Sequence, residues 1–274
     1  MKTWLITGAS SGLGLQMTRS LLARGDRVVA CGRRTAPFEA LQPDAGERLR
    51  VARFDVTDTD TMRREVDAAF AAFGRIDTVV SSAGYGLFGA AEEVSDAQIA
   101  RQIATNLTGS IQLVRAVLPH LRAQGGGRIL QVSSEGGQTS YPNFSLYHAT
   151  KWGIEGFLDS VAQEVAPFGI EIVIAEPGPT ETDFGRGLDH AVPLEVYDDT
   201  PAGEVRRAIA SGAFDLRGDA ARTAAAMIQV ADAAHPRRRI ALGSIAFDNI
   251  QRALTQRLED LQAQKALSLS ADRT

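Results

Sequence analysis

Two side chains with complementary acid–base properties, Tyr147 and Lys151, lie four residues apart in a stretch with helical periodicity. Residues at i and i+4 share one face of a helix, so the phenol and the amine are expected to lie side by side. A free tyrosine has a pKa of about 10, too high for ready proton exchange at neutral pH. A neighbouring ammonium group favours the phenolate and is expected to lower that pKa. Taken alone, such a pair is more often found on an ordinary protein surface than in a site.

Two further polar residues give this pair a chemical context. Ser134 lies thirteen residues before Tyr147, at the end of an expected strand. Its hydroxyl is suited to hydrogen-bond a substrate carbonyl while Tyr147 donates a proton, and in the oxidative direction the same groups would hold an alkoxide. Asn106 lies inside a helical stretch, where it either bends the helix, holds a water molecule or simply faces solvent. These residues form the candidate catalytic group.

The elements that must position these residues follow an alternating pattern of short apolar runs and longer helical stretches. Such alternation is typical of βαβ units and predicts an α/β protein with a doubly wound parallel sheet. We expect about seven strands with helices on both faces, a Rossmann-type arrangement. The expected strands cover residues 4–6, 27–31, 49–54, 76–81, 128–132, 170–175 and 239–242, and the expected helices 13–24, 58–73, 95–121, 144–166 and 219–233.

The chain is expected to form one domain over residues 1–274, since α/β folds often reach this size as a single unit. Residues 179–218 break the alternation and are interpreted as a substrate loop or lid. A helix over 244–265 is expected to cover either a neighbour or its own core. Several bulky residues are either walls of a hydrophobic substrate pocket or ordinary core: Leu87, Phe88, Tyr141, Phe144, Phe184 and Leu188.

A glycine-rich loop, Thr7 to Gly14, follows the first expected strand and opens the first helix. Gly8 permits a tight turn, Gly12 lets backbone approach a pyrophosphate, and Gly14 allows close helix–strand packing. Backbone amides at the helix start then face the phosphate charge. An isolated loop of this kind can also be an ordinary turn, and its position after a strand favours the nucleotide-binding interpretation.

The end of the second strand indicates which nicotinamide dinucleotide this loop would accept. NAD-binding folds place an acidic residue about 20 residues after the loop, against the ribose 2′-hydroxyl. Gly32 stands near that position, and Arg33 and Arg34 follow it with guanidinium groups suited to a 2′-phosphate, or are simply solvated. We therefore expect NADP(H) to be preferred over NAD(H). Asp55, before Val56, is either an adenine contact or a plain turn residue.

Composition and charge exclude several other classes of function. The net charge is −4, from 29 basic and 33 acidic side chains, which does not suggest a nucleic-acid surface. No run approaches the roughly 18 apolar residues of a membrane span, and Cys31 is alone, so a soluble cytoplasmic protein is expected. No metal site is expected, because no H-E-x-x-H or paired-cysteine spacing exists, and no G-x-S-x-G motif points to a hydrolase. The histidines are scattered: His120, His148, His190 and His235.

Together these motifs make the chain resemble the short-chain dehydrogenase/reductase family, in its single-domain branch, over residues 3–243. The T-G-x-x-x-G-x-G loop, the Y-x-x-x-K pair with its serine and helix asparagine, and the P-G after the sixth strand carry the likeness. The resemblance implies that Lys151 also binds the nicotinamide ribose and that Asn106 serves a proton relay through water. The implied cofactor-binding residues are Gly8, Ser10, Ser11, Gly12, Leu13, Gly14, Arg33, Arg34, Asp55, Val56, Ala83, Gly84, Tyr147, Lys151, Pro177, Gly178, Thr180 and Thr182.

Local sequence also resembles the 17β-hydroxysteroid dehydrogenase-like subgroup, at residues 83–89 and 176–179. That likeness implies ketone or aldehyde reduction with NADP(H), without establishing a steroid substrate. One departure is Ser82, where the family has an asparagine that mainly stabilises the sheet centre. Family members pair through two long helices, so a homodimer or homotetramer is expected.

The sequence thus predicts an NADP(H)-dependent oxidoreductase that transfers a hydride between nicotinamide and a ketone, aldehyde or secondary alcohol of hydrophobic character. The alternatives are an NAD-dependent alcohol dehydrogenase of the same family and a non-catalytic NADP-sensing regulator, which usually lacks the tyrosine or lysine. A nucleotide-sugar epimerase shares Y-x-x-x-K but has T-G-x-x-G-x-x-G spacing, with which this loop disagrees.

Overall fold

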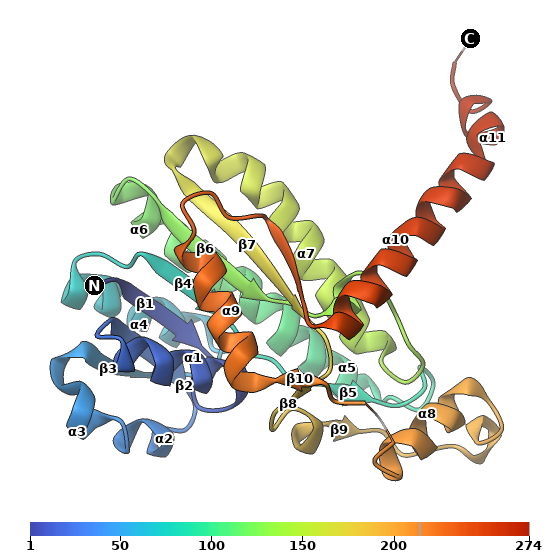
Figure 1. Cartoon of the computed structure of the whole chain (residues 1–274), viewed down its shortest axis with the longest axis horizontal. Coiled ribbons are helices and arrows are strands. Elements are labelled where there is room, and N and C mark those ends of the chain that lie inside the picture. The colour runs from blue at the N-terminus through green and yellow to red at the C-terminus, as the bar shows by residue number, and fades with distance from the viewer. Residues whose placement is uncertain (214, 274) are drawn as a thin grey trace.

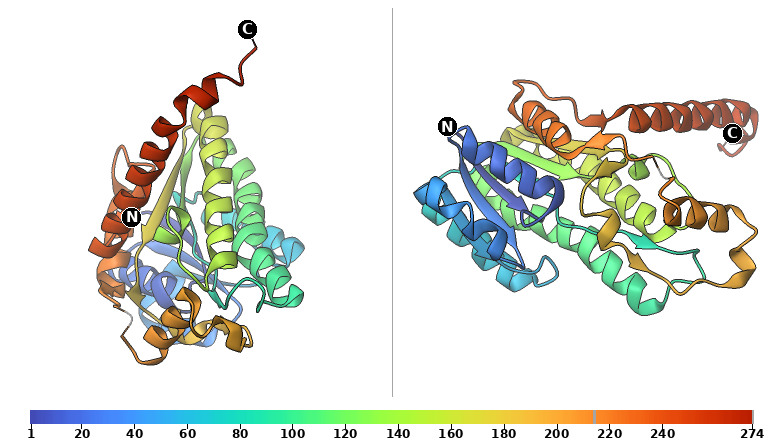
Figure 2. Two further views of the ribbon diagram at one scale, coloured as in Figure 1. Left: turned by 90° about the vertical axis from the view of Figure 1, so that its right-hand side faces the viewer. Right: turned by 60° about the horizontal axis from the view of Figure 1, so that its bottom comes forward.

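A central parallel sheet lies between two layers of helices in the computed structural model, which describes residues 1–213 and 215–273 (Figure 1, Figure 2). Within these residues the sheet has seven strands, and each pairing between neighbours is parallel. In order across the sheet they are β11 (Arg239–Leu242), β7 (Ile170–Pro177), β6 (Gly127–Val132), β4 (Thr78–Ser81), β1 (Thr3–Thr7), β2 (Arg27–Gly32) and β3 (Leu49–Arg53). The predicted α/β class is confirmed. The strand order changes direction between β1 and β4, the place where such sheets bind ligands.

Each face of the sheet is covered by amphipathic helices that bury one apolar stripe. On one face lie α1 (Gly12–Ala23) and α9 (Ala220–Asp232), which bury Met17 and Met227 against the strands. On the other lie α4 (Thr59–Phe73), α6 (Gly109–Ala123) and α7 (Ser145–Val165). Asp58 caps α4 by accepting a hydrogen bond from the Thr61 amide at 3.1 Å. Of these helices, α1, α4, α7 and α9 agree with the predicted ones to within about two residues.

The long helix expected over 95–121 is not continuous. It divides into α5 (Asp96–Ile103), a π-helical turn (Ala104–Thr108) and α6. A π turn accommodates one extra residue and locally widens the helix, which is a frequent device at functional sites. Asn106 lies in this turn and is 2% exposed, so the alternative in which it faces solvent is wrong.

Residues 179–218 contain regular structure where the sequence predicted an irregular lid. Two short parallel pairings fasten the segment, β8 (Thr180–Glu181) with β10 (Gly218–Asp219), and β9 (Asp189–His190) with β5 (Leu87–Phe88). Between them lies α8 (Pro201–Ala210). This helix begins where the Thr200 hydroxyl accepts from the Ala202 amide at 3.2 Å, with Pro201 in the first turn. Residue 214 lies outside the described residues.

The last helices run away from the body of the molecule (Figure 1). The helix α10 (Ser244–Ala263) packs its first turns on the body, where Ile250 is buried, and then leaves Leu254 and Leu258 exposed. It ends two residues before the predicted position and is followed by α11 (Lys265–Leu269). The short α2 (Ala36–Glu39) and α3 (Gln42–Ala45) connect β2 to β3. Among the described residues, none of these helices combines the length and the apolar character that crossing a bilayer requires.

Candidate active site

The amine of Lys151 lies inside the protein, between α7 and the carboxyl end of β6. The residue is only 7% exposed, and its Nζ donates a hydrogen bond to the Val132 carbonyl at 2.9 Å. The same Nζ lies 5.6 Å from the centroid of the Tyr147 ring, over its face. The structure therefore brings the predicted pair together on one face of α7, one helical turn apart.

The proton of Tyr147 is held more tightly than the sequence suggested. Burial raises the pKa of Tyr147 to about 12, while hydrogen bonding with Ser134 lowers it and the charge of Glu135 raises it. The expectation that Lys151 brings this pKa down is wrong. The physical reason is that desolvation dominates and the amine is directed at the Val132 carbonyl. Tyr147 consequently stays protonated throughout the neutral range.

Burial shifts the pKa of Lys151 in the opposite direction, downward. Removal from water lowers the pKa of Lys151 to about 8, and the negative charge of Glu155 opposes that fall. A lysine with this pKa is still mostly charged at neutral pH but loses its proton within the range in which enzymes are assayed. Its charge is thus sensitive to its surroundings.

Ser134 joins the pair from the end of β6. It begins a short 3₁₀ turn (Glu135–Gly137), where its Oγ accepts a hydrogen bond from the Gly136 amide at 3.1 Å. The hydroxyl also lies close enough to Tyr147 to lower the pKa of its phenol. A hydroxyl fixed by a backbone amide and next to a phenol can donate to an oxygen placed between them. The predicted neighbourhood of Ser134 and Tyr147 is present.

Asn106 connects the π turn to both sides of the site. Its Nδ2 donates to the Tyr85 carbonyl at 2.9 Å, and its Oδ1 accepts from the Tyr85 amide at 3.1 Å. Nδ2 also lies 3.4 Å from the Thr150 hydroxyl, which donates to the Tyr147 carbonyl at 2.7 Å. Asn106 therefore links the loop after β4 to the turn of α7 that carries Tyr147. Its role in a water relay stays a prediction.

The glycine loop between β1 and α1 is shaped by close backbone contacts. Gly8 has a φ of 66°, and a Cβ there would lie 2.9 Å from the backbone of Ala83. A Cβ on Gly14 would lie 2.5 Å from the Gly8 carbonyl oxygen. Side chains at these two positions would push the loop away from the sheet and α1 away from the loop, which agrees with the packing predicted for both.

The start of α1 faces open space. Its N-cap, Ser11, makes no side-chain capping hydrogen bond, so the first amides of the helix are free to bind an anion. A Cβ built on Gly12 would meet only Thr182, at 3.9 Å. Loop and helix end thus fit a pyrophosphate group, and Leu13 lies in the first turn of α1. Thr182, from the 179–218 segment, lies beside Gly12 of this loop, and its contact with the cofactor stays a prediction.

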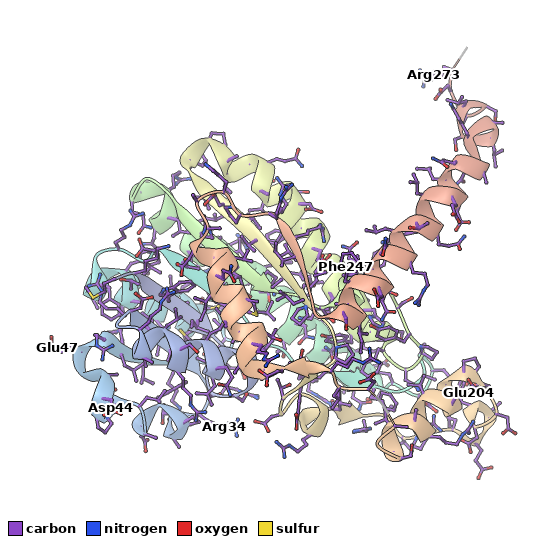
Figure 3. All side chains as sticks on the ribbon, in the orientation of Figure 1. Arg34, Asp44, Glu47, Glu204, Phe247 and Arg273 are labelled. Carbon is purple, nitrogen blue, oxygen red and sulfur yellow. The ribbon has the colours of Figure 1, made fainter. Side chains whose placement is uncertain are left out.

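The guanidinium group of Arg33 lies at the end of β2, next to the turn after β3. It is highly exposed and its Nη1 lies 3.7 Å from Oδ2 of Asp55. Asp55 also acts as a turn residue, because its Oδ1 accepts from the Thr57 amide at 2.9 Å. Gly32 lies against Ser10, and Arg34 is exposed beyond it (Figure 3). Two guanidinium groups without an acid at the ribose position fit a 2′-phosphate.

The remaining predicted cofactor residues lie in the segments that follow β3 and β4 and at the end of β7. Thr7 Oγ1 accepts from the amides of Ser82 at 3.1 Å and Ala83 at 3.4 Å, so a β1 hydroxyl that the sequence analysis did not single out fixes this loop. Within the segment after β7, the Thr180 hydroxyl donates a hydrogen bond to the Gly178 carbonyl at 2.8 Å, and the Gly178 amide donates to the Leu242 carbonyl at 3.0 Å. The further predicted positions in this region are Val56, Gly84, Pro177, Gly178 and Thr180.

Candidate substrate walls surround the Tyr147 ring only in part. Phe184 approaches it edge-on with centroids 5.6 Å apart, while Phe88 packs on Phe144 at 5.2 Å. Leu87 is buried in a small cluster with β9 and is core. The Tyr141 hydroxyl donates a hydrogen bond to the Glu135 carboxylate. Leu188 is partly buried beside β9. Phe144 also approaches the Tyr147 ring, with centroids 6.1 Å apart, so Phe144 and Phe184 are the candidate walls whose rings face the tyrosine.

Sequence reasoning missed a group of buried charges behind Lys151. Glu155 is 2% exposed and lies one turn further along α7, where it contacts Arg239 of β11 and Ser133. A signal was present, because a glutamate four residues after a buried lysine falls on the same inward face of the helix.

The fold and this constellation define a dinucleotide-binding oxidoreductase with a tyrosine–lysine pair. Comparison with known families agrees: the sequence model described as "short chain dehydrogenase" matches residues 2–192, and the chain belongs to this family. It is 40% identical over 201 residues to "Oxidoreductase BOA17" from Botryotinia fuckeliana, covering 73% of each chain.

Two further relatives extend the comparison. A "3-ketodihydrosphingosine reductase" from Bacteroides thetaiotaomicron is 34% identical over 180 residues, which are 66% of this chain and 64% of that protein. Among solved structures, a short-chain dehydrogenase from Streptomyces avermitilis superposes with a TM-score of 0.91 at 34% identity, covering 99% of this chain and 100% of the other. The likeness therefore includes the segment 179–218 and the C-terminal helices as well as the sheet.

Proposed function

We propose that this chain is an NADP(H)-dependent carbonyl reductase that acts on a ketone or aldehyde of hydrophobic character. The observation that carries the proposal is the buried Tyr147 phenol, which has Ser134 beside it and the Lys151 amine 5.6 Å from its ring centroid. A phenol that keeps its proton at neutral pH is a donor, and carbonyl reduction needs a proton donor at the developing alkoxide oxygen.

The reaction follows from these groups. Bound nicotinamide supplies the hydride for reduction and accepts it in the reverse direction. As the carbonyl carbon gains the hydride, its oxygen becomes negative and takes the phenolic proton of Tyr147. Ser134 donates a hydrogen bond to the same oxygen and so stabilises the charge before the proton arrives. The phenolate left on Tyr147 is stabilised by the charge of Lys151, and a proton from solvent restores the phenol.

Cofactor preference is argued from Arg33 and the glycine before it. With no carboxylate at the end of β2, nothing accepts a hydrogen bond from a ribose 2′-hydroxyl there, while Arg33 offers a charged partner to a 2′-phosphate. Binding would replace the weak exposed contact between Arg33 and Asp55. Asp55 would then still accept the hydrogen bond from the Thr57 amide.

The substrate class is argued from the aromatic ring of Phe184 over Tyr147. A neighbouring aromatic ring favours a carbonyl carried on an apolar body. The local resemblance to the 17β-hydroxysteroid dehydrogenase-like subgroup supports this choice, as does the name of the Bacteroides relative, a reductase of a keto compound. In this proposal residues 179–218 act as the substrate lid, and copies of this cytoplasmic protein pair through α5, α6 and α7.

A screen of turnover tests the proposal directly. Ketones, aldehydes and secondary alcohols, each offered with NADPH or NADH and their oxidised forms, are followed by nicotinamide absorbance. We expect reduction of apolar ketones with a higher kcat/KM for NADPH than for NADH. Equal or reversed cofactor values would support an NAD-dependent dehydrogenase instead, and absence of turnover together with cofactor binding would support a sensing role.

A further inference from the structure

A buried carboxylate, Glu155, lies directly behind the candidate catalytic group. Its Oε1 accepts a hydrogen bond from Ser133 Oγ at 2.5 Å, and its Oε2 accepts from Gln138 Nε2 at 2.5 Å. Arg239 of β11 forms an ion pair with the same Oε2. Ser133 precedes Ser134, and Gln138 follows the 3₁₀ turn that Ser134 begins. Glu155 thus holds both ends of the short segment that presents the Ser134 hydroxyl.

The backbone leaves a slot of the right shape for this carboxylate. A Cβ built on Gly137 would lie 1.9 Å from Glu155 Oε1 and 2.4 Å from its Cδ. The carboxylate therefore occupies the space that a side chain at position 137 would fill. Such a contact fixes the position of Glu155 through packing as well as through hydrogen bonds.

The charges that face Glu155 come from each element packed around it. On α7 these are Lys151, one turn before it, and Asp159, one turn after it. Arg239 is shared, since it also contacts Glu176 of β7 at 2.9 Å and Asp159 at 2.5 Å. Burial raises the pKa of Glu176, and the charge of Glu155 raises it further, which favours a proton on Glu176. Two more arginines lie at the edge of the cluster: Arg238, 3.9 Å from Asp159, and Arg257 of α10, 3.4 Å from Gln138.

We infer that Glu155 is a positioning residue: it holds the segment that carries Ser134 in place, and it lies one turn from Lys151 on the same buried face of α7, as the charge partner of that amine. The inference rests on the proposed function, in which a charged Lys151 stabilises the phenolate of Tyr147. Without an anion nearby, a fully buried amine loses its proton because the neutral form costs less to bury. The negative charge of Glu155, one turn away on α7, opposes this loss.

The chain offers a direct measurement of this effect, because its only lysines are Lys2, Lys151 and Lys265. Protein labelled with ¹³C at lysine Cε gives three resonances, and their shifts report the charge of each amine as pH is raised. The resonance of Lys151 is assigned by its absence in Lys151→Arg. In the wild-type protein we expect Lys151 to titrate near pH 8. A value close to those of the exposed lysines would overturn the inference.

The decisive comparison is Glu155→Gln, which removes the charge while keeping the size of the side chain. A negative neighbour stabilises the charged amine, so its removal should lower the pKa of Lys151 by at least about one, a tenfold fall in the ratio of charged to neutral amine. Glu155→Asp keeps the charge and should restore part of the difference. Glu164→Gln, an exposed residue of the same helix, is the matched control and should leave the titration unchanged.

Gly137→Ala provides a second route to the same result if Glu155→Gln does not fold. The added methyl group occupies the slot and displaces the carboxylate without altering any titratable group, so Lys151 should again titrate lower. Gly156→Ala, where a Cβ meets nothing within 4 Å, is its control. An unchanged Lys151 titration in either folded variant contradicts the inference. Because this readout needs neither cofactor nor substrate, it is separate from a failure of the proposed reductase activity.

Discussion

The ring of Phe184 lies edge-on to the ring of Tyr147, with centroids 5.6 Å apart and planes at 61°. The two residues come from distant parts of the fold, since Tyr147 is in α7 and Phe184 is in the segment that follows β8. Hydrogen bonds tie this segment to the body, from Gln98 to Asp189 at 2.9 Å and from Asn143 to the Ala202 carbonyl at 2.7 Å. An aromatic side chain is thus held at the phenol by anchored backbone.

Phe184→Ala should weaken substrate use more than it changes the fold. An aromatic contact is worth about 0.5–1.5 kcal/mol beyond its buried area, so kcat/KM for an apolar ketone should fall roughly threefold to tenfold, mostly through KM. Steady-state kinetics measure this. Phe247→Ala, on the exposed side of α10 (Figure 3), is the control and should leave KM unchanged. A loss confined to kcat would mean that Phe184 does not contact substrate.

Tyr147→Phe removes the proton donor while keeping the ring and its packing. A positioned general acid contributes about a hundredfold to ten-thousandfold, so kcat should fall by that factor. NADPH binding, followed by the fluorescence of the reduced cofactor, should survive. Tyr197→Phe, far along the 179–218 segment, should behave as wild type. Turnover close to wild type in Tyr147→Phe would show that the proton comes from another group.

Arg33→Ala tests the cofactor preference. A hydrogen bond to a charged group is worth about 1.5–3 kcal/mol, so kcat/KM with NADPH should fall about tenfold to a hundredfold while the value with NADH changes little. The ratio of the two values is the measurement. Arg63→Ala, an exposed arginine of α4, should not alter it. Equal losses with both cofactors would contradict a contact between Arg33 and the 2′-phosphate.

The reductive reaction should lose activity on the alkaline side. Lys151 is charged below its pKa, which burial lowers to about 8, and Tyr147 is protonated below a pKa of about 12. As pH rises, Lys151 therefore loses its charge first, and kcat/KM should be level through neutral pH and decline through about pH 8. A profile of initial rates against pH measures this. A rate that stays level to pH 10 would mean that the charge of Lys151 is not required.

Gly14→Ala should destabilise the fold at the nucleotide loop. A Cβ there would lie 2.5 Å from the Gly8 carbonyl, and overpacking of this kind costs about 1–3 kcal/mol. The midpoint of thermal unfolding should fall accordingly. Gly156→Ala, also in a helix but with open space, should be neutral or stabilising by about 0.5–1 kcal/mol. A Gly14 variant as stable as wild type would show that α1 can move away from the loop at little cost.

The sheet and its main helices could be predicted because their signals are local. Apolar runs mark each strand, and residues such as Asp58 and Asp219 mark helix starts by capping them. The π turn at Asn106 could not be predicted, since one inserted residue hardly disturbs the apolar period of a long helix. The helix α8 was missed although Thr200 followed by Pro201 is a helix-start signal, because the proline and glycine content of the segment favoured a loop.

The candidate site was predicted in its members and less well in its electrostatics. The four-residue spacing placed Lys151 beside Tyr147. Spacing cannot show that the Lys151 amine donates to the Val132 carbonyl, or that burial determines the pKa of Tyr147 more than the charge of Lys151 does. Contacts between Glu155, Glu176 and Arg239 join residues up to 84 positions apart, and no local pattern marks them.

Arg239 is synthesised later than the three carboxyl groups that it contacts. This guanidinium comes from the last strand of the sheet, so during synthesis α7 and β7 exist before the cation that neutralises Glu155, Glu176 and Asp159 has been added. A nascent chain that stops short of β11 carries these three carboxyl groups and lacks their common partner. The charge of this cluster is thus balanced only once the polypeptide is complete through residue 239.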